Sequence, residues 1–528
     1  MIKFNLKFLT IISIVFFFSC EQQEIDYLAI DQSVSAPSGE AGEADFTKFV
    51  SIGGAYTAGF GDGGLLHSGL QPYSVGASLA SRIALAGGSA EFVQPDINSE
   101  NGYFGAGADT TPGTADDEGR WYLTQSASTG DIGISRAPGD FTSVVTPYQG
   151  DMTTVQNFAF GKYPLAGFNF PNGTIADPNP YFARFDASNG TKSPIQLMTE
   201  ANGTFFMAWL GAYDFLAHYA RGGDENVFPE PTASSQGVFF QGMLTQILAD
   251  TTIKGVVGTV PDVLASPFFQ ILGSPTGLIP LDATEDAATL GQLAQLSGAY
   301  NQTVDLFAFE GAIGSAEAAT RKLAWSAGNN SLLINDSSLT NLEPLWRGLL
   351  LAGKMDSTQY GMLVPFAVAR QAKEGEIVHF LARPILGQPV VANDPTRGVW
   401  GVSAPLSDVY FLTGPELVYL ETQRLTYNEM IKQTVAAIGG GRVAVADFDG
   451  WFENLATGSP NTIMGSAVTY DFNPPTGMWS VDGLLPNARG YSLMADHFAQ
   501  AINDTFGSSI PMLNPADVPG VRLPVTVE

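Results

Sequence analysis

Three short stretches hold the residue types and turns from which an active site could be built. The first, 53–59, is a glycine-rich turn that follows the apolar-rich run 46–52. The second ends in Asp214 after the apolar run 205–210, and the third begins at Asp482. Glycine-rich turns between a strand and a helix expose backbone N–H groups at the helix start. These stretches are therefore the candidate site.

The same stretches resemble blocks I, III and V of the SGNH (GDSL) ester hydrolases. GGAYTAG at 53–59 is similar to the family's G-D-S-L-T-A-G block. FFMAWLGAYD at 205–214 is similar to its G-x-N-D block, and DGLLPNARGY at 482–491 to its D-G-x-H-P block. Gly161, in NFAFG, matches the glycine of block II. The resemblance implies an α/β fold, a three-layer α/β/α sandwich with a parallel sheet.

Three of the family's functional residues are replaced in this chain. Ala55 stands at the position of the nucleophilic serine, Tyr213 at that of the oxyanion asparagine, and Leu485 at that of the histidine. Acyl transfer needs an oxygen nucleophile, a base and oxyanion donors, and Ala55 and Leu485 supply neither of the first two. The resemblance therefore implies a site without turnover, with Asp214, Asp482 and Gly161 retained. The candidates for a remaining ligand pocket are Gly54, Ala55, Tyr56, Tyr213 and Asp482.

The loss of the histidine leaves Asp482 in need of another partner. A buried carboxylate without a donor costs several kcal/mol, on the order given for unpaired buried charges. Tyr213 and Arg489 are the two donors that the motif geometry suggests. The histidines are expected to be surface or packing residues, with His218, one turn after block III, placed to approach the pocket. The full set is His67, His218, His379 and His497.

Composition and charge exclude some classes of function. The chain has 528 residues, of which 52 are acidic and 24 basic, for a formal net charge of −28. Such a surface repels phosphate backbones, so nucleic-acid binding is disfavoured. One acidic loop, 109–119, could hold calcium through oxygen ligands, although its spacing does not match an EF-hand and favours a solvated loop. Its acids are Asp109, Asp116, Asp117 and Glu118. No other metal or cofactor is predicted.

The N-terminus has the pattern of a lipoprotein signal peptide. Residues 1–19 contain Lys3 and Lys7, then an apolar run that is short for a membrane span. FFSC ends at Cys20, the only cysteine, and reads as a lipobox. Cleavage before Cys20 and acylation, with palmitate among the chains, would anchor the protein, since each buried methylene contributes about 0.8 kcal/mol. A plain secretory leader is the alternative.

Residues 20–45 are expected to form a disordered tether after the lipidated cysteine. They carry seven acidic residues and no Lys or Arg. An acidic stretch at this place resembles the surface-export signal of Bacteroidota lipoproteins, which implies display on the outer face of the outer membrane. A spacer facing the periplasm remains open.

Strand and helix patterns alternate along the rest of the chain, as in an α/β fold. Strands are expected at 46–52, 205–210, 254–263 and 443–448. Thr413 to Glu416 is a capping box that starts a helix, and Tyr491, Met494, Phe498 and Ile502 mark the inward stripe of a closing helix. The expected domain spans 46–510, with long loops at 91–150, an insertion at about 275–396 and a tail at 511–528.

The leading expectation is a catalytically inactive, outer-membrane-anchored lipoprotein that acts as a binding or accessory subunit of an outer-membrane protein complex. A glycan or lipid ligand is also compatible with loops on a rigid α/β frame. The main alternative is an active esterase or acetyl-hydrolase on lipid or carbohydrate esters with relocated catalytic residues. A purely structural subunit without a ligand is the third.

Overall fold

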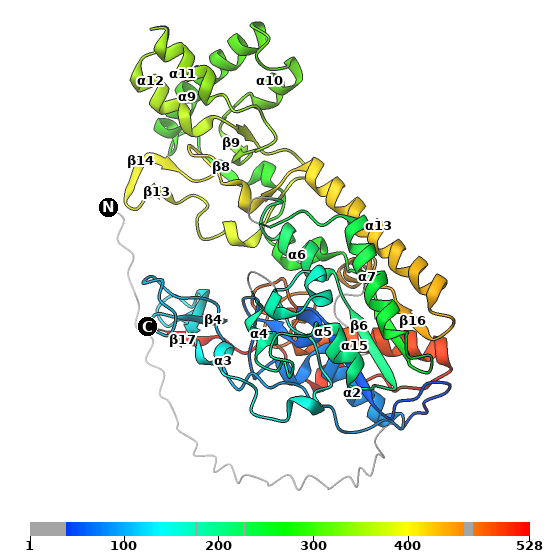
Figure 1. Cartoon of the computed structure of the whole chain (residues 1–528). Helices are drawn as coiled ribbons and strands as arrows, with labels where there is room; N and C mark the ends of the chain where they lie inside the picture. The colour runs from blue at the N-terminus through cyan, green and yellow to red at the C-terminus, as the bar shows by residue number, and fades with distance from the viewer. Residues whose placement is uncertain (1–37, 175–177, 225–227, 459–467, 528) are drawn as a thin grey trace, which may run out of the picture. The chain divides into compact units, whose positions relative to one another are not determined.

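The computed structural model describes residues 38–174, 178–224, 228–458 and 468–527 (Figure 1). The predicted signal peptide, the predicted lipidation site Cys20 and the predicted tether as far as residue 37 lie outside the described residues. Among the residues that are described, no helix is both long enough and apolar enough to cross a membrane.

A four-stranded parallel sheet lies at the centre of the fold. Its order is β1 (Phe49–Gly53), β6 (Phe205–Trp209), β7 (Lys254–Gly258) and β16 (Val443–Ala446). Nearly every side chain of these strands is buried. A parallel sheet covered on both faces calls for such continuous apolar strands. These are the four strands that the sequence predicts, and the α/β class with a parallel sheet is confirmed.

Two groups of helices cover the sheet. On one face α15 (Ala488–Phe506) packs on α2 (Val75–Leu85) and on β16. The rings of Phe205 and Trp209 in β6 lie 5.8 and 5.1 Å from those of Phe506 and Phe498 in α15. Since alternate strand residues point to opposite faces, Phe206 and Ala208 are directed at the other group. That group is α5 (Pro194–Glu200), α7 (Ala233–Ile247) and α13 (Gly414–Ile438).

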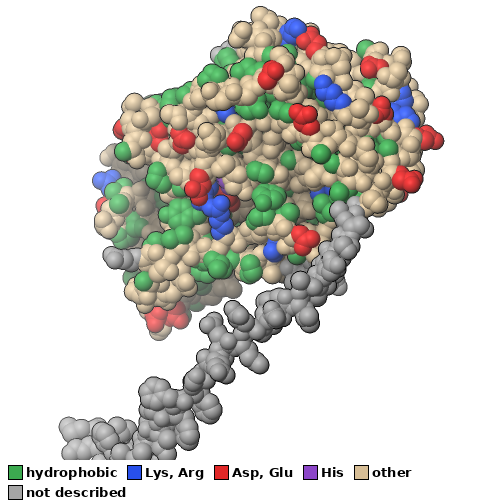
Figure 2. Space-filling view, turned by 90° about the horizontal axis from the view of Figure 1, so that it is seen from below, with side chains coloured by type: hydrophobic (Ala, Val, Ile, Leu, Met, Phe, Trp, Pro, Cys, Tyr) green, Lys and Arg blue, Asp and Glu red, His purple; other side chains and the backbone are tan. Residues whose placement is uncertain are grey.

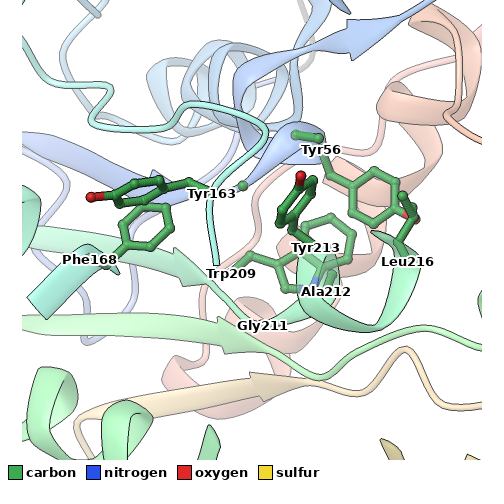
Figure 3. Close-up of a pocket in the computed structure, with 10 residues that line it drawn as sticks. Tyr56, Tyr163, Phe168, Trp209, Gly211, Ala212, Tyr213 and Leu216 are labelled. Carbon is green, nitrogen blue, oxygen red and sulfur yellow. The ribbon is translucent and has the colours of Figure 1, made fainter. Parts of the chain in front are cut away.

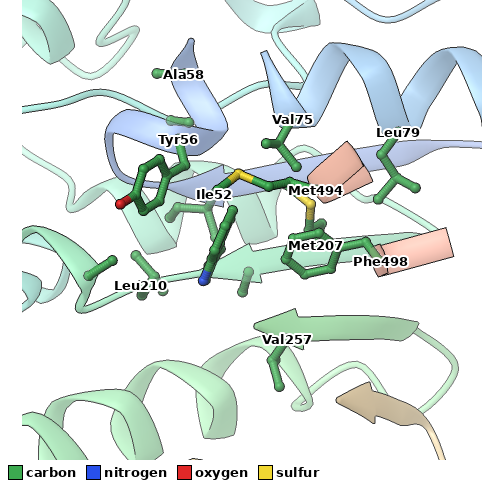
Figure 4. Close-up of a cluster of buried hydrophobic side chains, with 14 of the residues drawn as sticks. Ile52, Tyr56, Ala58, Val75, Leu79, Met207, Leu210, Val257, Met494 and Phe498 are labelled. Carbon is green, nitrogen blue, oxygen red and sulfur yellow. The ribbon is translucent and has the colours of Figure 1, made fainter. Parts of the chain in front are cut away.

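Two helix predictions are confirmed. The capping box Thr413–Glu416 is present, with each side chain bonded to the other residue's backbone N–H, and it begins α13. The four residues of the predicted inward stripe of α15 are all fully buried. Met494 and Phe498 of this stripe meet Val75 and Leu79 of α2 in the core (Figure 4).

The insertion builds elements and small cores of its own. Its helices are α9 (Ala287–Phe309), α10 (Ser315–Arg321), α11 (Glu343–Leu351) and α12 (Ser357–Leu363). Short antiparallel pairs accompany them: β8 (Ile279–Leu281) with β9 (Gly328–Asn330), β10 (Leu333–Asn335) with β11 (Ala369–Gln371), β12 (Ile377–Val378) with β15 (Phe411–Leu412), and β13 (Pro389–Val391) with β14 (Asp394–Val399). One core surrounds the buried rings of Tyr300 and Trp346. The buried Arg370 binds Glu376 through two hydrogen bonds of 2.8 and 2.6 Å.

The expectation of long loops at 91–150 is wrong for part of that region. β4 (Glu118–Ser126) and β5 (Ile132–Pro138) form an antiparallel hairpin. β17 (Val525–Val527), in the predicted tail, pairs parallel with β4 and completes a three-stranded sheet. The end of the chain is therefore part of the fold, because its backbone groups are paired with a strand some 400 residues earlier.

The described end of the predicted tether is packed on the domain. The Gly39 N–H donates to the Leu85 carbonyl at 2.9 Å, and the Glu43 N–H to that of Phe506 at 2.8 Å. Ser508 Oγ donates to the Ala41 carbonyl at 2.6 Å. The prediction of disorder as far as residue 45 is wrong for residues 38–45, because backbone pairing supplies the ordering that their apolar content does not.

The remaining short elements connect these parts. They are α1 (Ala55–Ala58), β2 (Phe60–Gly61), β3 (Leu65–Leu66), α3 (Thr142–Val145), α4 (Pro180–Ala183), α6 (Ala212–Tyr219), α8 (Pro267–Gln270) and α14 (Trp451–Thr457). On the face shown in Figure 2, acidic and basic side chains are scattered among uncharged and hydrophobic ones.

Candidate functional site

The structure brings the first two motif stretches together at the ends of neighbouring strands. β1 ends at Gly53, and Gly54 precedes α1, which begins at Ala55. β6 ends at Trp209, which pairs with Gly53, and Gly211 with φ 93° leads into α6. A left-handed backbone of this kind favours glycine. The Gly54 N–H donates to the Trp209 carbonyl at 3.3 Å, which fixes the two turns side by side.

The pocket between these turns is filled by its own side chains. Gly54, Ala55, Tyr56 and Tyr213 line it, as the sequence predicts, together with Tyr163, Phe168, Trp209, Gly211, Ala212 and Leu216 (Figure 3). The ring centroids of Tyr56 and Trp209 are 5.0 Å apart. The free volume is about 20 Å³, enough for about one water molecule. This volume is far below the range of small-molecule pockets.

Asp482 is held mainly by backbone amides, with a smaller contribution from the Ser480 side chain. Its Oδ2 accepts from the N–H groups of Gly63 and Gly64 at 2.8 and 3.2 Å. Its Oδ1 accepts from those of Leu484 and Leu485 at 2.8 and 2.9 Å. Burial raises the pKa of Asp482, and the backbone N–H groups oppose that rise. Asp482 does not line the filled pocket.

The prediction that Tyr213 or Arg489 pairs with Asp482 is wrong. Arg489 donates to the carbonyls of Pro475 and Val518, at 2.6 and 3.3 Å. The ring of Tyr213 packs edge-on against Phe228, with centroids 5.6 Å apart. Leu485, at the histidine position, is buried in the hydrophobic core. Asp482 and Leu485 thus have structural surroundings: an amide cradle for the carboxylate and the hydrophobic core for the leucine.

The hydroxyl group of Tyr56 has no hydrogen-bond partner in the described part of the chain, although its oxygen is fully buried. Burial, with the nearby charges of Asp482 and Asp262, raises the pKa of Tyr56 above the usual range. The side chain therefore stays neutral. Trp209, Tyr163 and Phe168 complete the filling of the pocket and were not predicted as site residues, although Trp209 lies within the block III stretch.

The other retained motif residues have structural surroundings. Gly161 lies against Phe60, and a Cβ at Gly161 would come within 2.7 Å of that ring. Asp214 is buried and accepts from the Leu165 N–H at 2.9 Å and from Gln236 Nε2 at 3.1 Å. Burial raises the pKa of Asp214 to about 6. Gln236 Oε1 is buried and has no partner among the described residues.

Asp214 should make the stability of the fold depend on pH. The Asp214→Asn variant should lack this dependence. Because its pKa rises from 3.8 to about 6 on folding, the folded protein holds a proton that the unfolded chain releases. This side chain therefore costs stability as the pH rises from about 4 to about 6, in total about 3 kcal/mol. Urea unfolding at a series of pH values measures this effect. As the pH rises from about 4 to about 6, the free energy of unfolding of Asp214→Asn should rise by that amount relative to that of the wild type. A difference that does not vary with pH would contradict this account.

None of the four histidines lines the filled pocket. His218 Nδ1 lies 2.9 Å from the Phe228 carbonyl, His379 Nε2 lies 2.8 Å from that of Val409, and His497 Nε2 lies 2.8 Å from that of Asp447. The expected approach of His218 to the pocket is thus not seen. His67 lies outside the filled pocket, and its Nε2 is 3.3 Å from Asp62 Oδ2.

The acids of the candidate calcium loop are engaged separately. Asp109 Oδ1 accepts from the Thr111 N–H at 2.8 Å, and Asp116 Oδ2 from the Asp109 N–H at 3.0 Å. Asp117 Oδ2 accepts from the Gly113 N–H at 2.8 Å, and Glu118 pairs with Arg136 at 2.7 Å. Within the described ranges, no three carboxylate, His or Cys side chains form a group that could hold a metal ion.

No protein-family model matches the sequence, and no curated protein matches it.

Proposed function

We propose that this chain is an SGNH-hydrolase-like lipoprotein that binds rather than hydrolyses. In this proposal the fold is a three-layer α/β/α sandwich of the SGNH type, and a lipid on Cys20 anchors it in the outer membrane, with the domain displayed at the cell surface. There it acts as a binding or accessory subunit of an outer-membrane protein complex. The resemblance and the N-terminal pattern support the family and the anchor.

The filled pocket is the observation that best supports the proposed loss of catalytic turnover. Ala55 and Tyr213 stand at the ends of adjacent parallel strands, where α/β folds bind ligands. The space between them holds about one water molecule. Leu485 is buried and Asp482 is bound by four amides, so neither supplies a base here. Among the described residues, the hydroxyl groups lining this space belong to Tyr56, Tyr163 and Tyr213, and burial raises the pKa of each, which favours the protonated form.

An ester-hydrolysis assay separates this proposal from an active esterase with relocated residues. The purified protein, given short-chain acyl nitrophenyl esters, is expected to show the rate of buffer alone. Ala55→Ser should stay inactive as well, because no base accompanies the new hydroxyl. Turnover by the wild type that disappears in Tyr213→Ala or Asp482→Ala would overturn the proposal.

The insertion offers surface for a partner. Phe309, at the end of α9, and Leu351, at the end of α11, are 91% and 82% exposed. In this proposal these two exposed apolar side chains contact the partner. The double variant Phe309→Ser/Leu351→Ser should therefore recover less membrane partner after gentle solubilisation and affinity purification, with an unchanged melting temperature.

Val238→Ser is the matched control, because Val238 is 66% exposed on α7, outside the insertion. Its recovery of partner should equal that of the wild type. A stoichiometric membrane protein in the wild-type eluate, found by mass spectrometry, supports the accessory subunit. Its absence from the eluate contradicts it. Incorporation of a palmitate analogue that Cys20→Ser abolishes tests the anchor separately.

A further inference from the structure

A second cavity, which shares no lining residue with the filled pocket, lies at the sheet formed by the end of the chain. Its free volume is about 480 Å³, within the range of small-molecule sites. The stretch 67–73, β4 and the stretch 519–523 contribute to its walls, with Ser480, Val481, Asn487 and Ala488 on a further side. The pairing of β17 with β4 brings the last of these stretches to the cavity.

A buried imidazole with a carboxylate behind it lines this cavity. His67 is 4% exposed, and its Nε2 lies 3.3 Å from Asp62 Oδ2. Both ring nitrogens, Nδ1 and Nε2, are buried, and neither makes a hydrogen bond of good geometry with the described residues. A Cβ placed on Gly69 would lie 3.2 Å from this Nδ1 and 2.9 Å from Arg522 Nη2, so the imidazole and the guanidinium meet at one place.

Asp62 is fixed from several sides, which makes the pair rigid. Its backbone has φ 49°, the left-handed region that Asp tolerates better than most residues. Its N–H donates to Ser480 Oγ at 2.9 Å, and its Oδ1 accepts from the Val481 N–H at 3.1 Å. Its carbonyl accepts from the Trp121 N–H at 2.7 Å. Such support holds a binding group in one geometry.

Two arginines of the cavity share one surface carboxylate. Arg522 Nη1 lies 3.2 Å from Glu100 Oε1, and Arg120 Nη2 lies 3.5 Å from the same oxygen. Glu100 is 68% exposed at its side chain, whereas Arg120 is 12% exposed. Two guanidinium groups that converge on one carboxylate oxygen form a site for a carboxylate, for which Arg has the matching planar donors. Glu100 occupies that site from the solvent side.

Aromatic side chains complete the wall. Tyr73, Trp121 and Tyr122 line the cavity beside Leu70, Leu123 and Val481. Aromatic faces next to fixed polar groups suit a compact ring that carries polar substituents.

We propose that this cavity binds a small carboxylate on a six-membered ring, with the carboxylate on Arg120 and Arg522 and the ring against the aromatic wall beside His67. Sugar acids and aromatic acids are the two sources of this chemistry. This site differs from the filled pocket. A test of ligand binding here is therefore independent of the test for a membrane complex.

Calorimetric titration of the purified full chain with glucuronate, glucose and benzoate tests the proposal. We expect heat from at least one of the two acids and none from glucose. Glucuronate binding identifies a sugar acid, and benzoate binding alone identifies an aromatic acid. Absence of binding by both acids at millimolar concentration overturns the proposal, as does equal binding of glucose.

Opposite effects of two surface variants distinguish this site from general charge attraction. Arg522→Gln should weaken binding by about tenfold or more, because it removes one charge-assisted contact. Glu100→Gln should tighten binding several-fold, because the competing carboxylate is gone. Gly69→Ala, whose methyl group displaces Arg522 without changing its charge, should weaken binding like Arg522→Gln.

A second ion pair on the surface provides the matched controls. Arg347 and Glu343 lie 2.6 Å apart in α11, and Arg347 is 62% exposed, like Arg522 at 61%. Arg347→Gln and Glu343→Gln should leave the affinity unchanged. Effects equal to those at Arg522 and Glu100 would show attraction by net charge alone and would overturn the site.

Discussion

Replacing Trp209 with alanine is expected to lower the free energy of unfolding by about 3–5 kcal/mol, the cost of removing a buried large aromatic ring. The Trp209 ring lies 4.4 Å from that of Phe448 and 5.1 Å from that of Phe498, centroid to centroid. Its Nε1 donates to the Thr259 carbonyl at 2.8 Å. Unfolding in urea, followed by circular dichroism, measures the loss.

Trp209→Phe separates the ring from its hydrogen bond. It keeps an aromatic ring and loses the donor to Thr259, so it should cost about 1–3 kcal/mol, mainly the unpaired carbonyl. A loss in Trp209→Ala no larger than that in Trp209→Phe would contradict the packing role of the ring.

The cavity opened by Trp209→Ala tests the filled pocket directly. The lost ring lines that pocket, so its volume would be added to a space that now holds about one water molecule. Indole should therefore bind the variant and raise its melting temperature, because a ligand that binds only the folded state stabilises it. The wild type should show no such rise. Tyr56→Phe, which removes a buried hydroxyl without a partner, should be neutral or stabilising.

Replacing Arg82 with methionine is expected to cost about 3–5 kcal/mol, because it leaves a buried carboxylate without its cation. Arg82 Nε lies 2.6 Å from Asp496 Oδ1, and the two side chains are 2% and 8% exposed. Arg82 Nη2 also donates to Ser492 Oγ at 2.7 Å. The guanidinium thus joins α2 to α15, and urea unfolding followed by tryptophan fluorescence measures its loss.

The loss of stability in Arg82→Met should depend on pH. Burial already raises the pKa of Asp496, and the charge of Arg82 opposes that rise. Without Arg82 the pKa rises further, so stability is lost as the pH increases through the new folded-state range. The variant should therefore be closer to wild type at pH 5 than at pH 7.

The double variant Arg82→Met/Asp496→Leu should recover much of the stability, because replacing both members of a buried pair by apolar groups removes the unpaired charge. Arg347→Met, at the exposed pair with Glu343, should change stability by less than about 1 kcal/mol. Failure of the double variant to recover would show that the contacts of Arg82 with α15 outweigh its charge pairing.

The elements that the sequence predicts correctly are those with a local signal. Continuous apolar runs mark β6 and β7, and the Thr413–Glu416 capping box marks the start of α13. The hairpin of β4 and β5 escaped prediction, since only a few of its side chains are buried and its pattern is close to that of a polar loop. β17 has three exposed residues and becomes a strand only by pairing with β4.

For the candidate site as well, the sequence predicts the features with a local signal and misses the others. The residues at the motif positions could be read directly, and with them the absence of a nucleophile at Ala55 and of a base at Leu485. The distant partners of Asp482 could not, because Gly63 and Gly64 contribute only backbone N–H groups from 419 and 418 residues away. Any residue but proline has such a group, so no side-chain pattern marks it.

The sequence by itself determined the order of the parallel strands along the chain, the helix that closes the fold and the chemistry missing from the three motifs. Only the tertiary structure decided that aromatic side chains fill the pocket, and that His67, Arg120 and Arg522 meet in another cavity. The reason is physical. Strand and helix patterns depend on neighbours in the chain, whereas free volume and converging charges depend on side chains from elements far apart in it.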